Sequence, residues 1–141
     1  QQLITQFAAD CEVISIGSSE LVHLAEQKLR GETITQQQLE PIVQRLIHSP
    51  AIDTVVLACT HFPLLKEELK AVLPHIRYWV DSGEAIARRV GYWLETPDLS
   101  PIDQESRTVS TAYFTKNNQE IDKLKPILKA LNLAKLSILP I

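Results

Sequence analysis

Short runs of β-branched and aliphatic residues alternate with segments of helical periodicity along most of this sequence. Four runs have the length and composition of strands, at residues 12–16, 53–58, 76–80 and 109–114. Four segments carry hydrophobic residues at the spacings of a single helix face, at residues 39–47, 65–73, 86–94 and 121–131. This alternation predicts an α/β fold with an open, mainly parallel sheet that is flanked by helices, each of which covers the sheet with its apolar face.

The segment 96–107 interrupts the alternation. It contains the turn-forming residues Pro97 and Pro101 and few aliphatic side chains, which is typical of a linker. We expect this linker to join a body at residues 1–95 to a β-α-β tail at residues 108–141. A tail of this size is too small to bury a core of its own, so we expect it to pack on the body or on a part of the protein outside this sequence.

Composition excludes several classes of function. The 141 residues include 14 basic and 17 acidic side chains, and the basic ones form no stripe of the kind that nucleic-acid backbones require. No hydrophobic run approaches the roughly 20 residues that a membrane-spanning helix needs. The 4 glycines are too scattered for a GxGxxG fingerprint or a Walker loop. We therefore expect neither nucleic acid nor a membrane as a partner.

The first residues of the sequence and its two cysteines indicate what kind of chain this is and in which cellular compartment it is expected. The sequence contains no Met and opens with Gln1–Ile4, which reads as a helix entered part-way, so we expect a piece of a longer protein. Its two cysteines, Cys11 and Cys59, occur without an export signal, which is typical of free thiols in a reducing, cytoplasmic setting.

The tripeptide Cys59-Thr60-His61 has the best position for chemistry. It follows the predicted strand 53–58 directly and precedes a helix that Pro63 helps to begin. Ligands of open α/β sheets bind at this edge, and a thiol beside a helix N-terminus and an imidazole favours its thiolate form. Cys59 is therefore a candidate base or nucleophile; the alternative is a buried cysteine that acts as a small hydrophobe beside a surface His61. A Cys-x-His pair has too few ligands for zinc, so no metal is expected.

The stretch 53–65 closely resembles a known catalytic motif. Its residues, Asp-Thr-Val-Val-Leu-Ala-Cys-Thr-His-Phe-Pro-Leu-Leu, are similar to the second cysteine motif of glutamate racemases, whose usual form is Leu-Gly-Cys-Thr-His-(Tyr/Phe)-Pro-Leu. Residues 19–26 resemble the family segment that ends in an active-site glutamate, and residues 80–89 resemble its next strand-to-helix turn. The resemblance is clear over residues 11–94. Ala58 departs from the usual Gly and adds a methyl group close to the site, which is expected to change packing and not chemistry.

The resemblance implies a specific reaction. Glutamate racemases use no cofactor: one thiolate removes the α-proton of glutamate and a thiol on the opposite face returns a proton. Cys59 would deprotonate L-glutamate and protonate the carbanion in the reverse direction, with His61 as its proton partner. Thr60 and His61 would bind substrate, and Glu26 would be a nearby acidic helper. The product, D-glutamate, would serve peptidoglycan synthesis, and the fold would be that of the Asp/Glu racemases.

Cys11 is not expected to be the second thiol. It precedes the predicted strand 12–16 whereas Cys59 follows its own, which places the two at opposite edges of a parallel sheet, at least roughly 15 Å apart. The resemblance assigns the other cysteine and the carboxylate-binding residues to an N-terminal domain that is absent from this sequence and that the tail 108–141 would join. We therefore expect the isolated chain not to racemise glutamate. The sequence leaves the oligomeric state open, a homodimer included.

Three alternative functions remain. An aspartate racemase is disfavoured because those enzymes tend to carry Glu where this chain has His61. A cysteine-histidine hydrolase would use Cys59 as a nucleophile, but the sequence pattern reveals no third orienting residue and no oxyanion hole. A non-catalytic regulatory or binding domain would retain the motif by descent alone.

Overall fold

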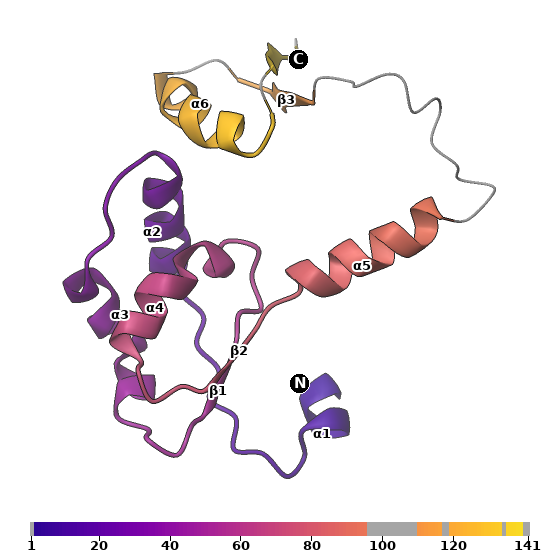
Figure 1. Ribbon diagram of the computed structural model, residues 1–141. Coiled ribbons are helices and arrows are strands. Elements are labelled where there is room, and N and C mark those ends of the chain that lie inside the picture. Colours follow the sequence, from indigo (N-terminus) through magenta and orange to yellow (C-terminus); the bar gives the residue numbers. More distant parts are fainter. Residues whose placement is uncertain (1, 96–109, 117–118, 134, 140–141) are drawn as a thin grey trace.

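The computed structural model describes residues 2–95, 110–116, 119–133 and 135–139 (Figure 1). The expected linker at 96–107 lies outside these residues, so the division into body, linker and tail stays a prediction. The elements of the first described range are α1 (Gln2–Phe7), α2 (Ser19–Leu29), α3 (Gln36–Ile47), β1 (Thr54–Val56), the 3₁₀ helix η1 (Phe62–Leu65), α4 (Lys66–Val72), β2 (Tyr78–Val80) and α5 (Gly83–Leu94). Those that follow are β3 (Thr111–Phe114), α6 (Gln119–Ala130) and β4 (Lys135–Ile138).

The described strands form two parallel pairs. β1 pairs with β2 so that Thr54 faces Tyr78 and Val56 faces Val80, and the backbone N–H of Leu57 extends the ladder to the carbonyl of Val80 at 2.8 Å. β3 pairs with β4 in the same sense, with α6 as the crossover between them. The predicted α/β class with parallel strands is confirmed, as are the strands expected within 53–58, 76–80 and 109–114.

Residues 12–16 correct the sequence prediction. They were expected to form a strand, but the structure gives them no strand assignment, and the side chain of Val13 is 46% exposed. Hydrophobic and β-branched composition favours an extended backbone, yet a strand also needs a neighbouring backbone with which to exchange hydrogen bonds. No described segment supplies that ladder here.

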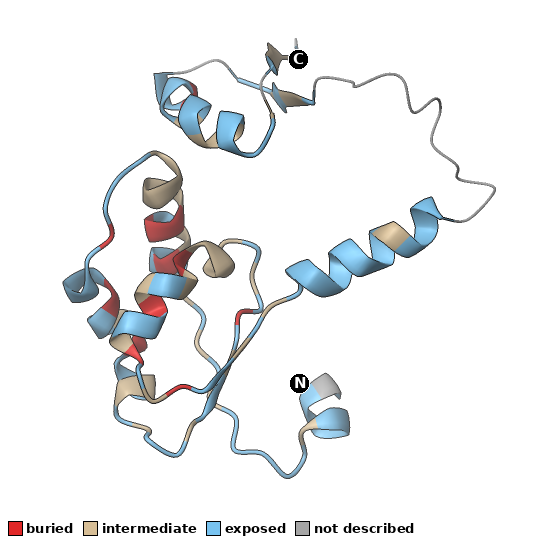
Figure 2. Cartoon of the chain, viewed as in Figure 1, coloured by how far each residue is buried: buried red, intermediate tan, exposed pale blue. Residues whose placement is uncertain are grey.

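The hydrophobic core lies between α2, α3, η1 and α4, where Figure 2 shows most of the buried positions. Leu39 and Leu65 are fully buried, and Leu73 is 1% exposed. The predicted stripe of 39–47 is confirmed, because α3 directs Leu39 and Val43 into this core. At the start of α3, the backbone N–H of Thr35 donates to Oε1 of Gln38 at 2.9 Å, which is one arm of a capping box.

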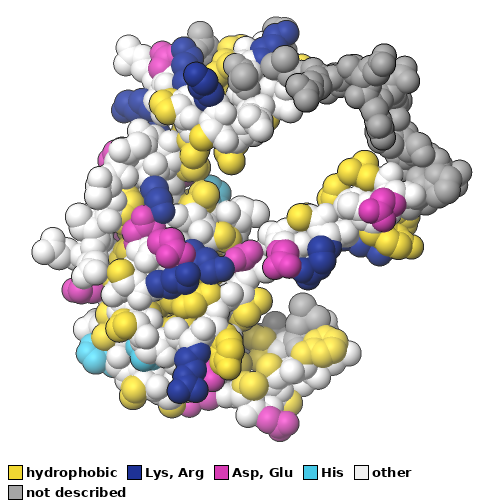
Figure 3. Space-filling model, viewed as in Figure 1, with side chains coloured by type: hydrophobic (Ala, Val, Ile, Leu, Met, Phe, Trp, Pro, Cys, Tyr) yellow, Lys and Arg dark blue, Asp and Glu magenta, His cyan; other side chains and the backbone are white. Residues whose placement is uncertain are grey.

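The apolar face of α5 is a second correction. The periodicity of 86–94 predicts the helix correctly, but it also predicts burial against a sheet, and no residue of α5 is buried. Ile86, Val90 and Leu94 are each more than half exposed. Among the described residues the sheet beside Cys59 has only the strands β1 and β2, and Figure 3 shows hydrophobic side chains gathered toward the far end of α5.

Candidate functional site

Cys59 lies at the carboxyl edge of the β1–β2 sheet, where the sequence places it. Its strand ends at Val56, and Ala58 closes a tight turn by donating its N–H to the carbonyl of Val56 at 3.0 Å. The thiol is free and half-buried, so it is sheltered but accessible. Since β1 and β2 are parallel, the turn after β2 that begins at Asp81 lies at this same edge.

His61 directs its imidazole toward the thiol. It is the N-cap residue of η1, with Pro63 as the second residue of that helix. Its Nδ1 lies 3.9 Å from the Sγ of Cys59, within the range of a hydrogen bond that involves sulfur, and 3.4 Å from the Oγ1 of Thr60. The side chains of the Cys-Thr-His motif therefore meet at one point, with the imidazole between the two others.

Glu26 approaches the other side of the same imidazole. Its Oε1 lies 3.9 Å from the Nε2 of His61, and the two side chains are 40% and 35% exposed. Glu26 belongs to α2, which Ser18 caps by accepting the N–H of Leu21 at 3.1 Å. The helix ends before Gly31, whose φ of +89° is the left-handed conformation that favours glycine.

These three side chains form a line of thiol, imidazole and carboxylate. In the tautomer that carries its proton on Nε2, on the side of the carboxylate, the lone pair of Nδ1 faces Sγ. In that tautomer His61 can accept the proton of the Cys59 thiol and return it. The arrangement is suited to proton transfer to and from the sulfur.

Two lysines that the sequence analysis did not single out join the elements around this site. The Nζ of Lys28 donates to the carbonyl of Leu64 at 2.7 Å and pairs with the carboxylate of Glu68 at 2.7 Å. The Nζ of Lys66 lies 3.1 Å from Oδ2 of Asp81. Their partners lie up to 40 residues away in sequence, so no local pattern could have revealed them.

The carboxylate of Asp81 is held by the turn that follows β2. Its Oδ1 accepts the N–H of Gly83 at 3.0 Å, which stabilises the start of α5. This hydrogen bond, together with the ammonium group of Lys66, lowers the pKa of Asp81 from its ordinary value of 3.8.

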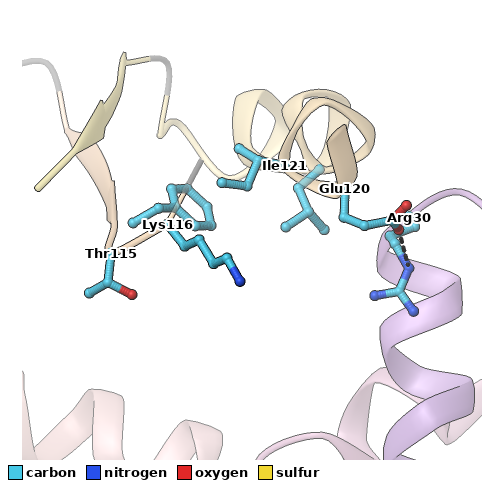
Figure 4. Close-up of a pocket in the computed structure, with 7 residues that line it drawn as sticks. Arg30, Thr115, Lys116, Glu120 and Ile121 are labelled. Carbon is cyan, nitrogen blue, oxygen red and sulfur yellow. Dashed lines mark ion pairs between the residues drawn. The ribbon is translucent and has the colours of Figure 1, made fainter. Parts of the chain in front are cut away.

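A shallow pocket of about 260 Å³ opens between α2 and the segment formed by β3 and α6 (Figure 4). Arg30 lies at its rim, with Nε 3.5 Å from Oε2 of Glu120 and a second nitrogen 3.8 Å from Oε2 of Glu26. Lys123 and, more weakly, Arg30 lower the pKa of Glu120. The lining of this pocket does not include the Cys59 motif.

Two kinds of feature are absent from the described residues. No group of three or more His, Cys, Asp or Glu side chains is close enough there to hold a metal ion. In the same part of the chain, no helix is both long enough and apolar enough to cross a bilayer.

Comparison with known proteins shows which proteins the chain is similar to. No protein-family model matches the chain. A glutamate racemase of Pectobacterium atrosepticum is 46% identical over 143 residues, which cover 99% of this chain and 48% of that protein. A glutamate racemase of Yersinia enterocolitica is 44% identical with 100% and 48% coverage, and one of Actinobacillus pleuropneumoniae is 37% identical with 98% and 51% coverage.

A solved structure shares the fold. The Escherichia coli glutamate racemase, solved in complex with L-glutamate and the activator UDP-MurNAc-ala, superposes with a TM-score of 0.85 at 39% identity. The match covers 98% of this chain and 51% of the E. coli chain. The chain thus spans about half the length of the curated relatives it matches. The resemblance to the glutamate racemases is confirmed: this chain is a homologue of them, matched along nearly its whole length to about half of theirs.

Proposed function

We propose that this chain supplies one of the two proton-transferring thiols of a glutamate racemase. The observation that carries the proposal is the line from Cys59 through His61 to Glu26, with 3.9 Å between sulfur and Nδ1 and 3.9 Å between Nε2 and carboxylate. The half-buried sulfur lies at the sheet edge where α/β proteins bind their ligands.

In the proposed reaction, the Cys59 thiolate removes the α-proton of L-glutamate. The C–H electron pair remains on the α-carbon as a carbanion, an S–H bond forms, and a thiol on the opposite face donates the proton that completes inversion. In the reverse direction the Cys59 thiol protonates the carbanion. His61 relays protons to the sulfur, Glu26 holds the imidazole in the required tautomer, and Thr60 with His61 binds substrate.

The second thiol is assigned to a region that this chain does not match. Cys11 is exposed and lies between α1 and α2, away from the Cys-Thr-His turn in sequence. The relatives are about twice as long as the chain, and we place the opposite-face cysteine and the groups that bind the substrate carboxylates in their other half. On this proposal the 141 residues alone do not racemise glutamate, and that other half is their partner.

The proposed setting follows from the same chemistry. Free thiols persist in a reducing cytoplasm, so we place the reaction there, and the D-glutamate it forms would enter bacterial peptidoglycan. L-glutamate as the substrate is supported by the complex of the E. coli relative. The histidine at position 61, and the fact that the relatives are glutamate racemases, favour glutamate over aspartate as the substrate.

One observation favours a second candidate. Sequence patterns reveal no third residue for a cysteine-histidine hydrolase, yet Glu26 occupies the position of such an orienting carboxylate. A hydrolase would form a covalent acyl intermediate on Cys59, whereas a racemase forms none. Mass spectrometry of the protein after incubation with activated esters therefore distinguishes the two; an acyl adduct on Cys59 that turns over would favour the hydrolase.

The racemase proposal is tested in a chimera. Residues 1–141 replace the matching half of the E. coli racemase, and the chimera is incubated with L-glutamate in D₂O while NMR follows the α-proton. We expect deuterated D-glutamate, and we expect Cys59→Ser to abolish it while glutamate binding persists. Racemisation by the Cys59→Ser chimera would overturn the proposal. Racemisation by the isolated chain would overturn the assignment of the second thiol to another region.

A further inference from the structure

Lys28 joins α2, which carries Glu26, to η1, which His61 caps. It lies on α2 two residues after Glu26, and its Nζ donates to the carbonyl of Leu64 at 2.7 Å. The same ammonium group pairs with both carboxylate oxygens of Glu68, at 2.7 and 2.8 Å. These distances are the short ones of charge-assisted hydrogen bonds.

The bond to Leu64 leads directly to the site. Leu64 lies in η1 and its own N–H donates to the carbonyl of His61 at 3.0 Å. One path therefore runs from Lys28 through Leu64 to the backbone of His61, and a second runs along α2 from Lys28 to Glu26. The contact between His61 and Glu26 closes a ring of interactions across two elements.

The geometry that this ring maintains has little tolerance. The imidazole ring of His61 lies 3.9 Å from the carboxylate of Glu26, and this contact spans the two elements, so a shift of η1 away from α2 would separate these two groups. Functional groups must be held within about 0.5 Å by their supporting contacts. Because Lys28 and Glu68 are only 35% and 24% exposed, their pair is better shielded from water than the surface pair of Lys70 with Glu67.

We propose that Lys28 is a positioning residue: it holds η1 against α2 so that Glu26 stays beside His61, whose other ring nitrogen faces Cys59. The proposal rests on the proposed function, because it takes the Cys59 thiol as the proton carrier whose environment must be kept. Lys28 itself touches no reacting atom and acts through Leu64 and Glu68.

The test measures the reactivity of Cys59 in the 141-residue chain. In a Cys11→Ser background, the rate of alkylation by iodoacetamide is followed by mass spectrometry across neutral pH. Four proteins form a double-mutant cycle: the background, Lys28→Met, Glu26→Gln and the double variant. Lys70→Met is the matched control, since it removes a lysine from α4 whose partner Glu67 lies on the same helix surface. Circular dichroism and urea unfolding report folding separately.

We expect Lys28→Met to lower the alkylation rate about threefold or more when Glu26 is present. When Glu26 is already replaced by Gln, we expect Lys28→Met to lower the rate no further. Such non-additivity is the sign that two residues act in one network. Lys28→Arg should restore most of the rate, and Lys70→Met should leave it unchanged. Equal rate losses in both Glu26 backgrounds, or no loss, would overturn the proposal. If Lys28→Met does not fold, Glu68→Gln takes its place in the cycle with the same expected pattern and the same overturning result.

This cycle needs no glutamate, so it separates the two proposals. An inactive chimera together with a coupled cycle would overturn the racemase function and leave the positioning role of Lys28. An active chimera together with an uncoupled cycle would support the racemase function and overturn the positioning role of Lys28.

Discussion

Lys66 and Asp81 join the first turn of α4 to the turn after β2, with 3.1 Å between Nζ and Oδ2. Asp81 lies at the same sheet edge as Cys59, because β1 and β2 are parallel and the two residues each follow the end of one of these strands. Asp81 also accepts the N–H of Gly83 at the start of α5. One carboxylate thus connects three elements that border the candidate site.

The carboxylate of Asp81 should make the stability of the fold fall at acidic pH. The N–H of Gly83, and then Lys66, lower the folded-state pKa of Asp81 below its ordinary value of 3.8, so its stabilising contribution is present above that value and is lost as pH falls through the folded-state pKa. Asp81→Asn should therefore lower stability at neutral pH and flatten its loss in acid. Urea unfolding at a series of pH values measures this; Glu40→Gln on the exposed side of α3 is the control and should leave the acid slope unchanged. An Asp81→Asn protein with the parent acid slope would contradict the prediction.

His61 should matter to rate more than to folding. In the chimera, His61→Ala should lower kcat for racemisation by about 10²–10⁴-fold, which is the usual contribution of a positioned acid or base. Its side chain is 35% exposed, so removing it should disturb packing little. Steady-state kinetics measure the effect, with His23→Ala on the exposed face of α2 as the control. A His61→Ala enzyme within twofold of the parent kcat would count against the imidazole as proton partner.

Gly31 should resist substitution for a backbone reason. Its φ of +89° is strained for any residue with a Cβ, although the space around it is open, so Gly31→Ala should destabilise the chain by roughly 1 kcal/mol or more. Gly17 has open space without a positive φ, and Gly17→Ala should be neutral or slightly stabilising. Chemical denaturation compares the two. Equal effects at both positions would show that the end of α2 does not depend on the left-handed conformation.

Leu39 should be among the costliest truncations in the core. It is fully buried between α3 and its neighbours, so Leu39→Ala should lower the free energy of unfolding by about 2–5 kcal/mol. Leu131 is 61% exposed, and Leu131→Ala should change the free energy of unfolding by less than about 0.5 kcal/mol. Urea unfolding of both variants is the measurement. A loss below about 1 kcal/mol at Leu39 would mean that the core relaxes to fill the space.

Local patterns were sufficient to predict most helices and the paired strands. The apolar period of 39–47 depends on neighbours three and four residues apart, and the structure turns those residues inward as α3. The position of Cys59 also follows locally, from a β-branched run followed by a Pro-initiated helix. The role of Glu26 was implied only by family resemblance, because nothing in the spacing of 35 residues connects it to His61.

The order of residues by itself indicated most of the helices, the strands within 53–58, 76–80 and 109–114, and that a thiol, a hydroxyl and an imidazole follow one strand. Tertiary structure alone decided that Glu26 meets His61 and that Lys28 reaches Leu64 and Glu68. It also decided that, within the described part of the chain, residues 12–16 join no strand ladder and the apolar face of α5 stays exposed. The physical reason is that helix periodicity arises from bonds between near neighbours, whereas strand pairing, burial and ion pairs require two distant segments to be brought together.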